Sequence, residues 1–437
     1  MSAARPIDTG TERGDGSLLA LALLSLLVGA AAGLIGSVFR LCLEQADLWR
    51  EQVIAWGHGR GMLGLAVVCG LCAAATTTAA WLVRRYSPDA SGSGIPHVEA
   101  VLEGEVHPAP PRLIPVKFFG GLLAIGAGLA LGREGPSVQM GAGAAHLLGK
   151  LFRRSWWDCR VLLAAGAGAG LATAFKAPIA GAVFVLEELV RRFDTRIAIA
   201  TFGASTSAIA AARLLLGQEP DFSVDALPYP GFGTVPVNLV LGILAGLLGV
   251  AYNRTILAAL ALAERTHRWP VEQRAAVVGA AVGLLAWFLP NLVGGGDDLT
   301  QATLQGGGMI QLLPWIFLFR FALGPLSYAA GTPGGLFAPM LVLGSQSGRL
   351  FGELCQHWLP GVTADPTAFA VTGMAAFFTA SVRAPITAIT LAVGVTGTHT
   401  QLLPMLGACF TAMLVPTLLH NPPIYDSLRP QATRPSP

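Results

Sequence analysis

The chain has 437 residues, of which 53% are hydrophobic and only 12% are charged. Soluble domains carry roughly 25% charged residues, so this composition excludes an ordinary soluble protein and predicts helices embedded in lipid. The net charge of +3 comes from scattered basic residues, which gives no reason to expect a nucleic-acid partner.

Apolar segments follow one another along most of the chain, between polar tails expected at residues 1–16 and 426–437. Residues 275–296 and 384–425 hold no Asp, Glu, Lys or Arg, which suits one and two crossings at about 20 residues each. Many segments are interrupted by glycine or proline, and broken backbone at membrane depth survives only inside protein or beside a polar cavity. Further apolar segments begin near Ser17, Met62, Leu113, Val161, Ile197, Val235, Leu312, Leu336, Phe369 and Gln401.

Two stretches repeat each other at almost half the length of the chain. Residues 27–40 match residues 240–253, and the KAPI sequence that starts at Lys176 recurs as RAPI from Arg383. The offsets, 213 and 207 residues, nearly agree. They predict a duplicated membrane unit, residues 17–231 and 232–425, and such duplications are typical of transporters and channels whose site lies between the halves.

Two glycine-rich breaks are candidate anion sites. The sequence GSGIP begins at Gly92 and places the Ser93 hydroxyl at an expected helix start, where free backbone N–H groups bind anions. The sequence GTPGGLFAP, from Gly331 to Pro339, again opens a helix. Taken singly, the first is better explained as a plain turn with a capping serine, and the alternative for the second is a loop between helices.

A third break, GREGP from Gly132, places two ionisable residues inside uncharged sequence. Arg133 and Glu134 lie between residues 118–131 and 137–148, where charge is costly and is functional by default. The alternative is a surface turn in which Arg133 and Glu134 form a local ion pair.

A fourth candidate, Glu187-Glu188, closes the apolar helix expected at residues 179–186. An exposed helix end would pair Glu187 with Arg191 and Glu188 with Arg192, which is the structural alternative to a functional acid. At the repeat offset of 207 residues, Gly394 takes the place of Glu187, so the acids are special to the first half.

These motifs together resemble the CLC family of chloride channels and chloride/proton antiporters. The resemblance covers about residues 17–425 in the family's order and is specific as a set. The matching motifs are GSGIP at Gly92, GREGP at Gly132, GGLFAP at Gly334, the APIAG and EE run from Ala177 to Glu188, and PIY ending in Tyr425.

The resemblance implies an all-α polytopic membrane protein, built from two inverted-topology repeats of tilted, partly broken helices. It further implies a homodimer with one pore per subunit in a bacterial inner membrane, transported chloride and protons as ligands, and no other cofactor. The prokaryotic type lacks a regulatory domain, and none is expected after Tyr425.

The resemblance also assigns roles to residues of this chain. Ser93 and Tyr425 would hold a central chloride with the backbone N–H groups of Leu336 and Phe337. Glu134 would be the gating glutamate and Glu188 the inner acid that relays protons. The expected anion-binding set is Ser93, Gly94, Ile95, Arg133, Gly135, Leu336, Phe337, Ala338 and Tyr425.

Two departures and two alternatives complete the prediction. Lys176 replaces a smaller or neutral residue and either snorkels to the interface or adds positive potential near the anion path, and Gly394 stands where many members have a glutamate. An intramembrane enzyme is disfavoured because no HExxH or GxSG motif is present. A passive channel stays open, although both Glu134 and Glu188 favour antiport.

No metal site is predicted from the cysteines. Only Cys69 and Cys72 have the spacing of a metal pair, and no second pair or nearby histidine accompanies them. Small buried hydrophobic side chains explain these cysteines better.

Overall fold

The computed structural model describes residues 17–265, 269–307, 310–359 and 365–432, so the N-terminal tail and the last five residues lie outside the described residues. The regular elements of the first half are all helices, and one of them is a π-helical turn. The elements of this half are α1 (Leu18–His58), α2 (Met62–Tyr86), α3 (Ile95–Glu103), α4 (Leu113–Gly126), α5 (Glu134–Leu151), α6 (Trp156–Ala174), α7 (Pro178–Phe184), η2 (Val185–Leu189) and α8 (Thr195–Leu216).

The second half shows a similar order of long, short and broken helices, and the predicted all-α class is confirmed. One further short helix, α17 (Ile424–Ala432), follows the second half. The elements of the second half are α9 (Val235–Arg265), α10 (Val271–Phe288), α11 (Asp297–Leu304), α12 (Leu313–Tyr328), α13 (Phe337–Trp358), α14 (Pro366–Val382), α15 (Pro385–Thr396) and α16 (Leu402–Leu418).

Equivalent helices pack in equivalent ways in the two halves. Helix α1 packs on α8 and α6, as α9 packs on α16 and α14, and the pair α5 and α6 corresponds to α13 and α14. The matching glycines make matching contacts: a Cβ on Gly29 would meet the Ala204 carbonyl oxygen at 2.0 Å, and one on Gly242 would meet that of Ala408 at 2.1 Å. Glycine is therefore required at both places for the backbones to approach.

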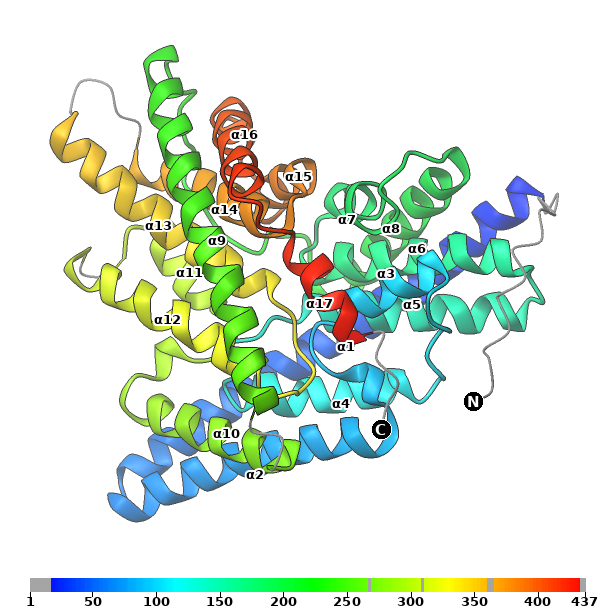
Figure 1. The fold of residues 1–437 in the computed structure, drawn as a ribbon, viewed down its shortest axis with the longest axis horizontal. Helices are drawn as coiled ribbons and strands as arrows, with labels where there is room; N and C mark the ends of the chain where they lie inside the picture. The colour runs from blue at the N-terminus through cyan, green and yellow to red at the C-terminus, as the bar shows by residue number, and fades with distance from the viewer. Residues whose placement is uncertain (1–16, 266–268, 308–309, 360–364, 433–437) are drawn as a thin grey trace.

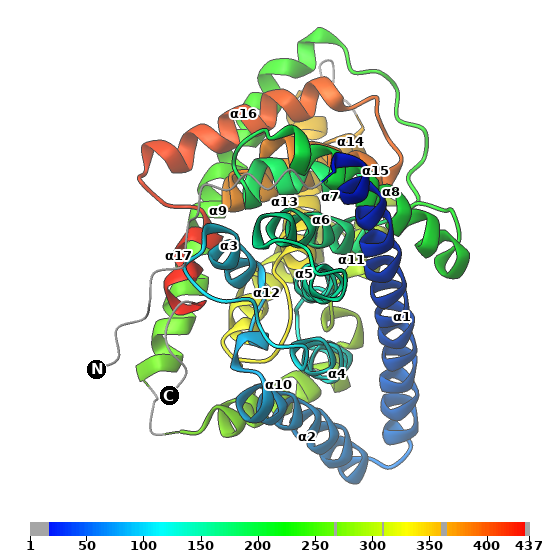
Figure 2. The ribbon, with the colours of Figure 1, turned by 90° about the vertical axis from the view of Figure 1, so that its right-hand side faces the viewer.

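The halves interlock through three pairs of helices. Helix α2 packs along α10, α7 packs on α15, and α5 contacts α13, and Figure 1 shows the first two pairs side by side. Figure 2 shows α5 and α6 in the interior, between α1 on one side and α3 with α17 on the other. Helix α5, which follows one of the glycine-rich breaks, is thus surrounded by protein.

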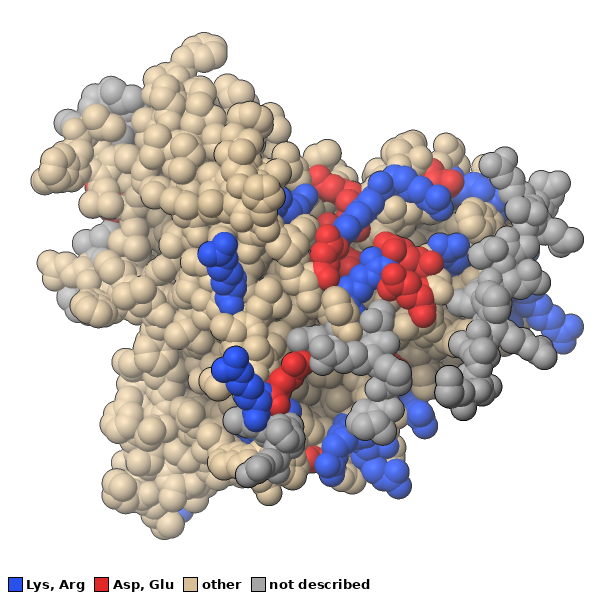
Figure 3. All heavy atoms as spheres, in the orientation of Figure 1, with Lys and Arg blue, Asp and Glu red and all other residues tan. Residues whose placement is uncertain are grey.

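Within the described residues, five helices are long and apolar enough to cross a membrane: α1, α2, α8, α9 with the short turn before it, and α10. Many of their large apolar side chains are exposed, as expected for surfaces that face lipid. Charged side chains concentrate instead on one region of the face seen in Figure 3, around the place of α3 and α17.

Helix α17 extends beyond Tyr425, so part of the segment expected to be a polar tail is helical and docked. Arg429 of α17 donates hydrogen bonds to Glu103 (2.9 Å) and Glu105 (3.0 Å), at and after the end of α3. Tyr425, near the start of α17, is completely buried. The docked helix therefore fixes this tyrosine in the interior.

Candidate functional site

The three glycine-rich breaks, which are far apart in the sequence, lie against one another in the structure. The N–H of Gly92 donates to the Thr332 carbonyl (3.1 Å), and the N–H of Gly334 donates back to Gly92 (3.0 Å). Gly132 and Gly335 exchange two hydrogen bonds, at 2.8 and 2.7 Å. These short backbone pairings satisfy the polar groups of broken chain inside the protein, as membrane depth requires.

Each break leads directly into a helix, so three helix N-termini converge at one place. Gly94 precedes α3 with a left-handed φ of 82°, Glu134 is the first residue of α5, and Phe337 is the first residue of α13. Each N-terminus is equivalent to roughly half a positive charge. The structure thereby brings together nine predicted site residues: Ser93, Gly94, Ile95, Arg133, Glu134, Gly135, Leu336, Phe337 and Ala338.

Glu134 is buried at the centre of this junction, with a relative exposure of 1%. Its carboxylate folds back over Gly132, where an added Cβ would meet the Oε2 atom at 1.9 Å, and it lies by the backbone N–H of Ala338. The Oε2 atom has no hydrogen-bond partner among the described residues. The side chain also lines a cavity of about 530 Å³ that contains several acids and arginines.

The predicted alternative of a surface turn at Arg133 and Glu134 is wrong. Arg133 forms ion pairs with Asp297 (2.6 Å) and Asp221 (3.5 Å), and its guanidinium donates to the Ala174 carbonyl (3.1 Å). It therefore ties the start of α5 to α11 and to the segment between the halves. Glu134 is left without an ion pair in the described part of the chain and points into the junction.

Two buried hydroxyl groups lie at the same junction. The Ser93 and Tyr425 side chains are both 0% exposed, and their hydroxyl groups lie near each other. Neither hydroxyl oxygen makes a hydrogen bond of normal geometry among the described residues. Ser93 lies against Gly135, and the Tyr425 ring lies 5.8 Å from that of Phe337. Unpartnered buried donors are costly. A compact anion between the helix N-termini would satisfy both hydroxyls.

Glu188 lies in the π-helical turn η2 and is 3% exposed. π-Helical turns are rare and frequently occur at functional sites. Its Oε1 atom is 3.4 Å from a guanidinium nitrogen of Arg191, which also pairs with Asp426 at 2.5 Å. Since Asp426 follows Tyr425, Arg191 connects the two predicted site residues Glu188 and Tyr425.

The predicted pairs from Glu187 to Arg191 and from Glu188 to Arg192 are wrong, because the π-helical turn changes the spacing of these side chains. The Glu187 carboxylate instead accepts hydrogen bonds from the N–H groups of Ile386 (3.0 Å) and Thr387 (2.6 Å) and from the Thr387 hydroxyl (2.7 Å). It caps the N-terminus of α15 in the other half. Glu187 is thus a structural acid, and Glu188 is a buried one.

The two departures from the family pattern have distinct surroundings. Lys176 donates to the Glu219 carbonyl (2.9 Å) and lies 3.6 Å from Asp221, which also binds Arg40 at 2.6 Å. It therefore belongs to the charged network at the cavity next to Glu134. Gly394 packs against α7, since an added Cβ would lie 2.6 Å from that of Ala177. A glutamate would not fit there without a shift of α15.

Sequence reasoning missed several buried polar residues that support the junction. Lys117 of α4 is completely buried, and its ammonium group donates to the carbonyls of Ala90 (3.0 Å) and Gly92 (2.7 Å). The Tyr328 hydroxyl accepts the Ser93 N–H at 3.3 Å. A lone lysine in the apolar segment 113–126 was the available signal for Lys117. Nothing local distinguished Tyr328.

An all-helical membrane fold with converging helix N-termini, and with a buried glutamate that forms no ion pair among the described residues, defines an anion-transport protein. The chain belongs to the voltage gated chloride channel (CLC) family, because the model of that family matches residues 75–417. This match covers most of both repeats.

Curated relatives and solved structures agree with the family. The chain is 38% identical over 413 residues to the H(+)/Cl(-) exchange transporter ClcA of Vibrio cholerae serotype O1, with 93% of this chain and 88% of the relative covered. It is 36% identical to the ClcA transporter of Cronobacter sakazakii, with 95% and 90% covered. A slow cyanobacterial Cl−/H+ antiporter matches with a TM-score of 0.89 and 30% identity, over 94% of this chain and 98% of that one.

Proposed function

We propose that this protein exchanges chloride for protons across a bacterial inner membrane. The observation that carries the proposal is the junction itself. A buried carboxylate, Glu134, and two buried hydroxyls that make no hydrogen bond of normal geometry among the described residues lie where three helix N-termini converge. Similarity to relatives named as H(+)/Cl(−) exchange transporters supports the same reaction.

Chloride would bind between Ser93, Tyr425 and the backbone N–H groups of Leu336 and Phe337. Helix N-termini compensate the ion for its lost hydration with partial charges, and a partial charge releases an anion more readily than a full cation does. Hydroxyl and backbone donors alone would therefore suit an ion that must both enter and leave. The Arg133 guanidinium is engaged by Asp297 and Asp221 and would act on the ion only at longer range.

Glu134 would serve as the gate. Its carboxylate lies by the same type of backbone donor that would hold chloride, close to the N–H of Ala338. The ionised side chain would compete with the anion, and a protonated one would leave the site. Anion occupancy and proton binding would thereby be linked at one residue.

Glu188 would pass protons between the junction and the side of the membrane opposite to the Glu134 gate. Glu188 is buried, and its 3.4 Å contact with Arg191 is longer than the contacts of a short bidentate pair. A carboxylate held this weakly can bind and release a proton, which supports this role. A passive chloride channel of the same fold is the alternative. Such a channel would need no inner acid, and a buried Glu188 favours exchange.

We also propose that the protein is a homodimer in which each subunit has its own pore. This assembly follows from the family resemblance, and each subunit would carry a complete set of the site residues. No enzyme activity and no cofactor besides the transported chloride are proposed.

Simultaneous measurement of chloride and proton fluxes tests the proposal. Purified protein in vesicles should use an outward chloride gradient to drive proton uptake against the proton gradient. Chloride efflux without proton movement would favour the passive channel. Vesicles without protein provide the baseline for both ions.

A further inference from the structure

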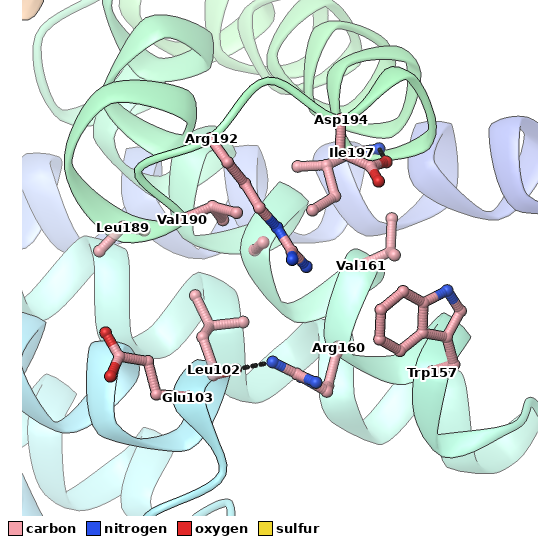
Figure 4. A pocket seen from close by; sticks show the side chains of 11 residues that line it. Leu102, Glu103, Trp157, Arg160, Val161, Leu189, Val190, Arg192, Asp194 and Ile197 are labelled. Carbon is pink, nitrogen blue, oxygen red and sulfur yellow. Dashed lines mark hydrogen bonds between the residues drawn. The ribbon is translucent and has the colours of Figure 1, made fainter. Parts of the chain in front are cut away.

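A cavity of about 240 Å³ lies beside the π-helical turn that carries Glu188. It is enclosed by the end of α3, the first turns of α6, and the segment that joins η2 to α8 (Figure 4). The walls are mainly apolar and consist of Leu102, Val161, Leu189, Val190 and Ile197.

Two arginines from different elements direct their guanidinium groups into this cavity. Figure 4 shows Arg160 of α6 and Arg192, from the segment before α8, on facing sides of the space. The Arg160 guanidinium donates to the Leu102 carbonyl and lies 5.5 Å from the centre of the Trp157 ring. Within the described part of the chain, neither arginine forms an ion pair.

The acids that line the cavity are occupied elsewhere. Asp194 accepts the N–H groups of Arg196 (2.9 Å) and Ile197 (3.1 Å) and caps α8. Glu103 accepts hydrogen bonds from Arg429 of α17. Two positive charges that repel each other therefore face one another across the cavity. Glu103 attracts Arg160 but is already hydrogen-bonded to Arg429, so an anion between the two arginines would stabilise the arrangement.

We propose that this cavity binds a phosphate group, held between the guanidinium groups of Arg160 and Arg192. The planar fork of arginine matches phosphate oxygens with paired hydrogen bonds. The apolar walls would contact the remainder of a phosphate ester. The group has two sources with the same chemistry, a free phosphate and the head group of an acidic phospholipid.

Such a ligand would contact two elements of the proposed transport site, α3 and the turn η2 that carries Glu188. Leu102 lies in the last turn of α3, the helix that begins directly after Gly94, and Leu189 directly follows Glu188. A bound phosphate would link these two elements. The site is separate from the chloride junction, and its binding can be measured without transport.

Binding to the purified full-length protein in a neutral detergent, at constant chloride concentration, tests the proposal. The probes are inorganic phosphate, dihexanoyl phosphatidylglycerol, and dihexanoyl phosphatidylcholine, whose head group has no net charge. The proteins are the wild type, Arg192→Gln, Arg160→Gln and the control Arg213→Gln, which removes an exposed arginine of α8 outside the cavity. Calorimetric titration gives each dissociation constant.

Wild type and Arg213→Gln should bind alike, and Arg192→Gln should weaken binding by about tenfold or more, the usual worth of a hydrogen bond to a charged group. Binding of phosphatidylglycerol alone would identify a lipid head group as the source, and binding of inorganic phosphate would identify a free anion. Arg192 lies in an exposed segment, so its variant keeps the test valid if Arg160→Gln does not fold. The proposal is overturned if neither anionic probe binds the wild type, or if Arg192→Gln binds them unchanged.

Discussion

Gly132 and Gly335, 203 positions apart in the chain, exchange two backbone hydrogen bonds at 2.8 and 2.7 Å. This pairing joins the break before α5 to the break before α13 and holds Glu134 against the N-terminus of the second helix. The acid and the backbone donors of the proposed site come from opposite halves of the duplication. Predictions about this site therefore concern both halves at once.

Replacing Glu134 with alanine should remove both the gate and the proton acceptor. Chloride flux should persist and lose its dependence on pH, while coupled proton uptake should fall to the level of protein-free vesicles. Chloride efflux and proton uptake measured from acidic to neutral pH check this. Glu51→Ala, which removes an acid that lines the same cavity, should keep the wild-type profile. A Glu134→Ala protein with intact coupling would contradict the gate assignment.

Replacing Glu188 with glutamine should abolish proton movement and leave chloride flux largely intact. Glutamine keeps the size of the side chain, but its amide group does not bind and release a proton as a carboxylate does. Proton uptake driven by a chloride gradient measures the change, and Glu353→Gln, which removes a partly exposed acid on α13, serves as the control. Undiminished uptake in the Glu188→Gln protein would leave this acid a structural partner of Arg191.

Replacing Ser93 with proline should lower the preference for chloride over nitrate. The change removes the hydroxyl and also the N–H that binds the Tyr328 hydroxyl at 3.3 Å. Ser93→Ala, which removes the hydroxyl alone, separates the two effects. The chloride/nitrate permeability ratio is the measurement. An unchanged ratio in both variants would mean that the break at Gly92 does not form the central anion site.

Replacing Lys176 with methionine should reduce anion flux most at low salt, if its charge acts on the anion path. The charge network of Lys176, Asp221 and Arg133 borders the cavity that reaches Glu134. Screening lengths fall from about 30 Å at 0.01 M to about 8 Å at 0.15 M salt, so the effect should shrink as salt rises. Lys150→Met, at the far end of α5, is the control. Equal loss at every salt concentration would indicate an anchoring role.

Replacing Arg429 with glutamine should loosen α17 and destabilise the protein slightly. Hydrogen bonds from Arg429 lower the pKa of the Glu103 carboxyl below its ordinary value of 4.5. Because the folded-state pKa is the lower one, this stabilisation is present above pH 4.5 and is lost as pH falls through the folded-state value. The difference in melting temperature between wild type and variant should therefore shrink in acid. A difference that is constant with pH would contradict the pairing.

The sequence by itself was sufficient to predict an all-α membrane protein and the starts of most of its helices. Expected segments at Met62, Leu113 and Val235 begin where α2, α4 and α9 begin. Lipid exposure imposes long apolar runs, and breaks in those runs are visible locally. The motifs at Gly92, Gly132 and Gly334 marked the junction for the same reason, since a charged or glycine-rich break inside apolar sequence needs a special environment.

Only the tertiary structure decided which groups meet. The partners of Arg133 are Asp221 and Asp297, and Glu187 caps α15 in the other half. The support of the junction by Lys117 and Tyr328 likewise depends on contacts between distant segments. Local spacing in the sequence predicts which side chains are neighbours within one regular helix. A π-helical turn changes those neighbours, and the contacts between helices depend on how the helices pack. Sequence therefore determined where the breaks fall, and packing between the halves determined what each buried charge contacts.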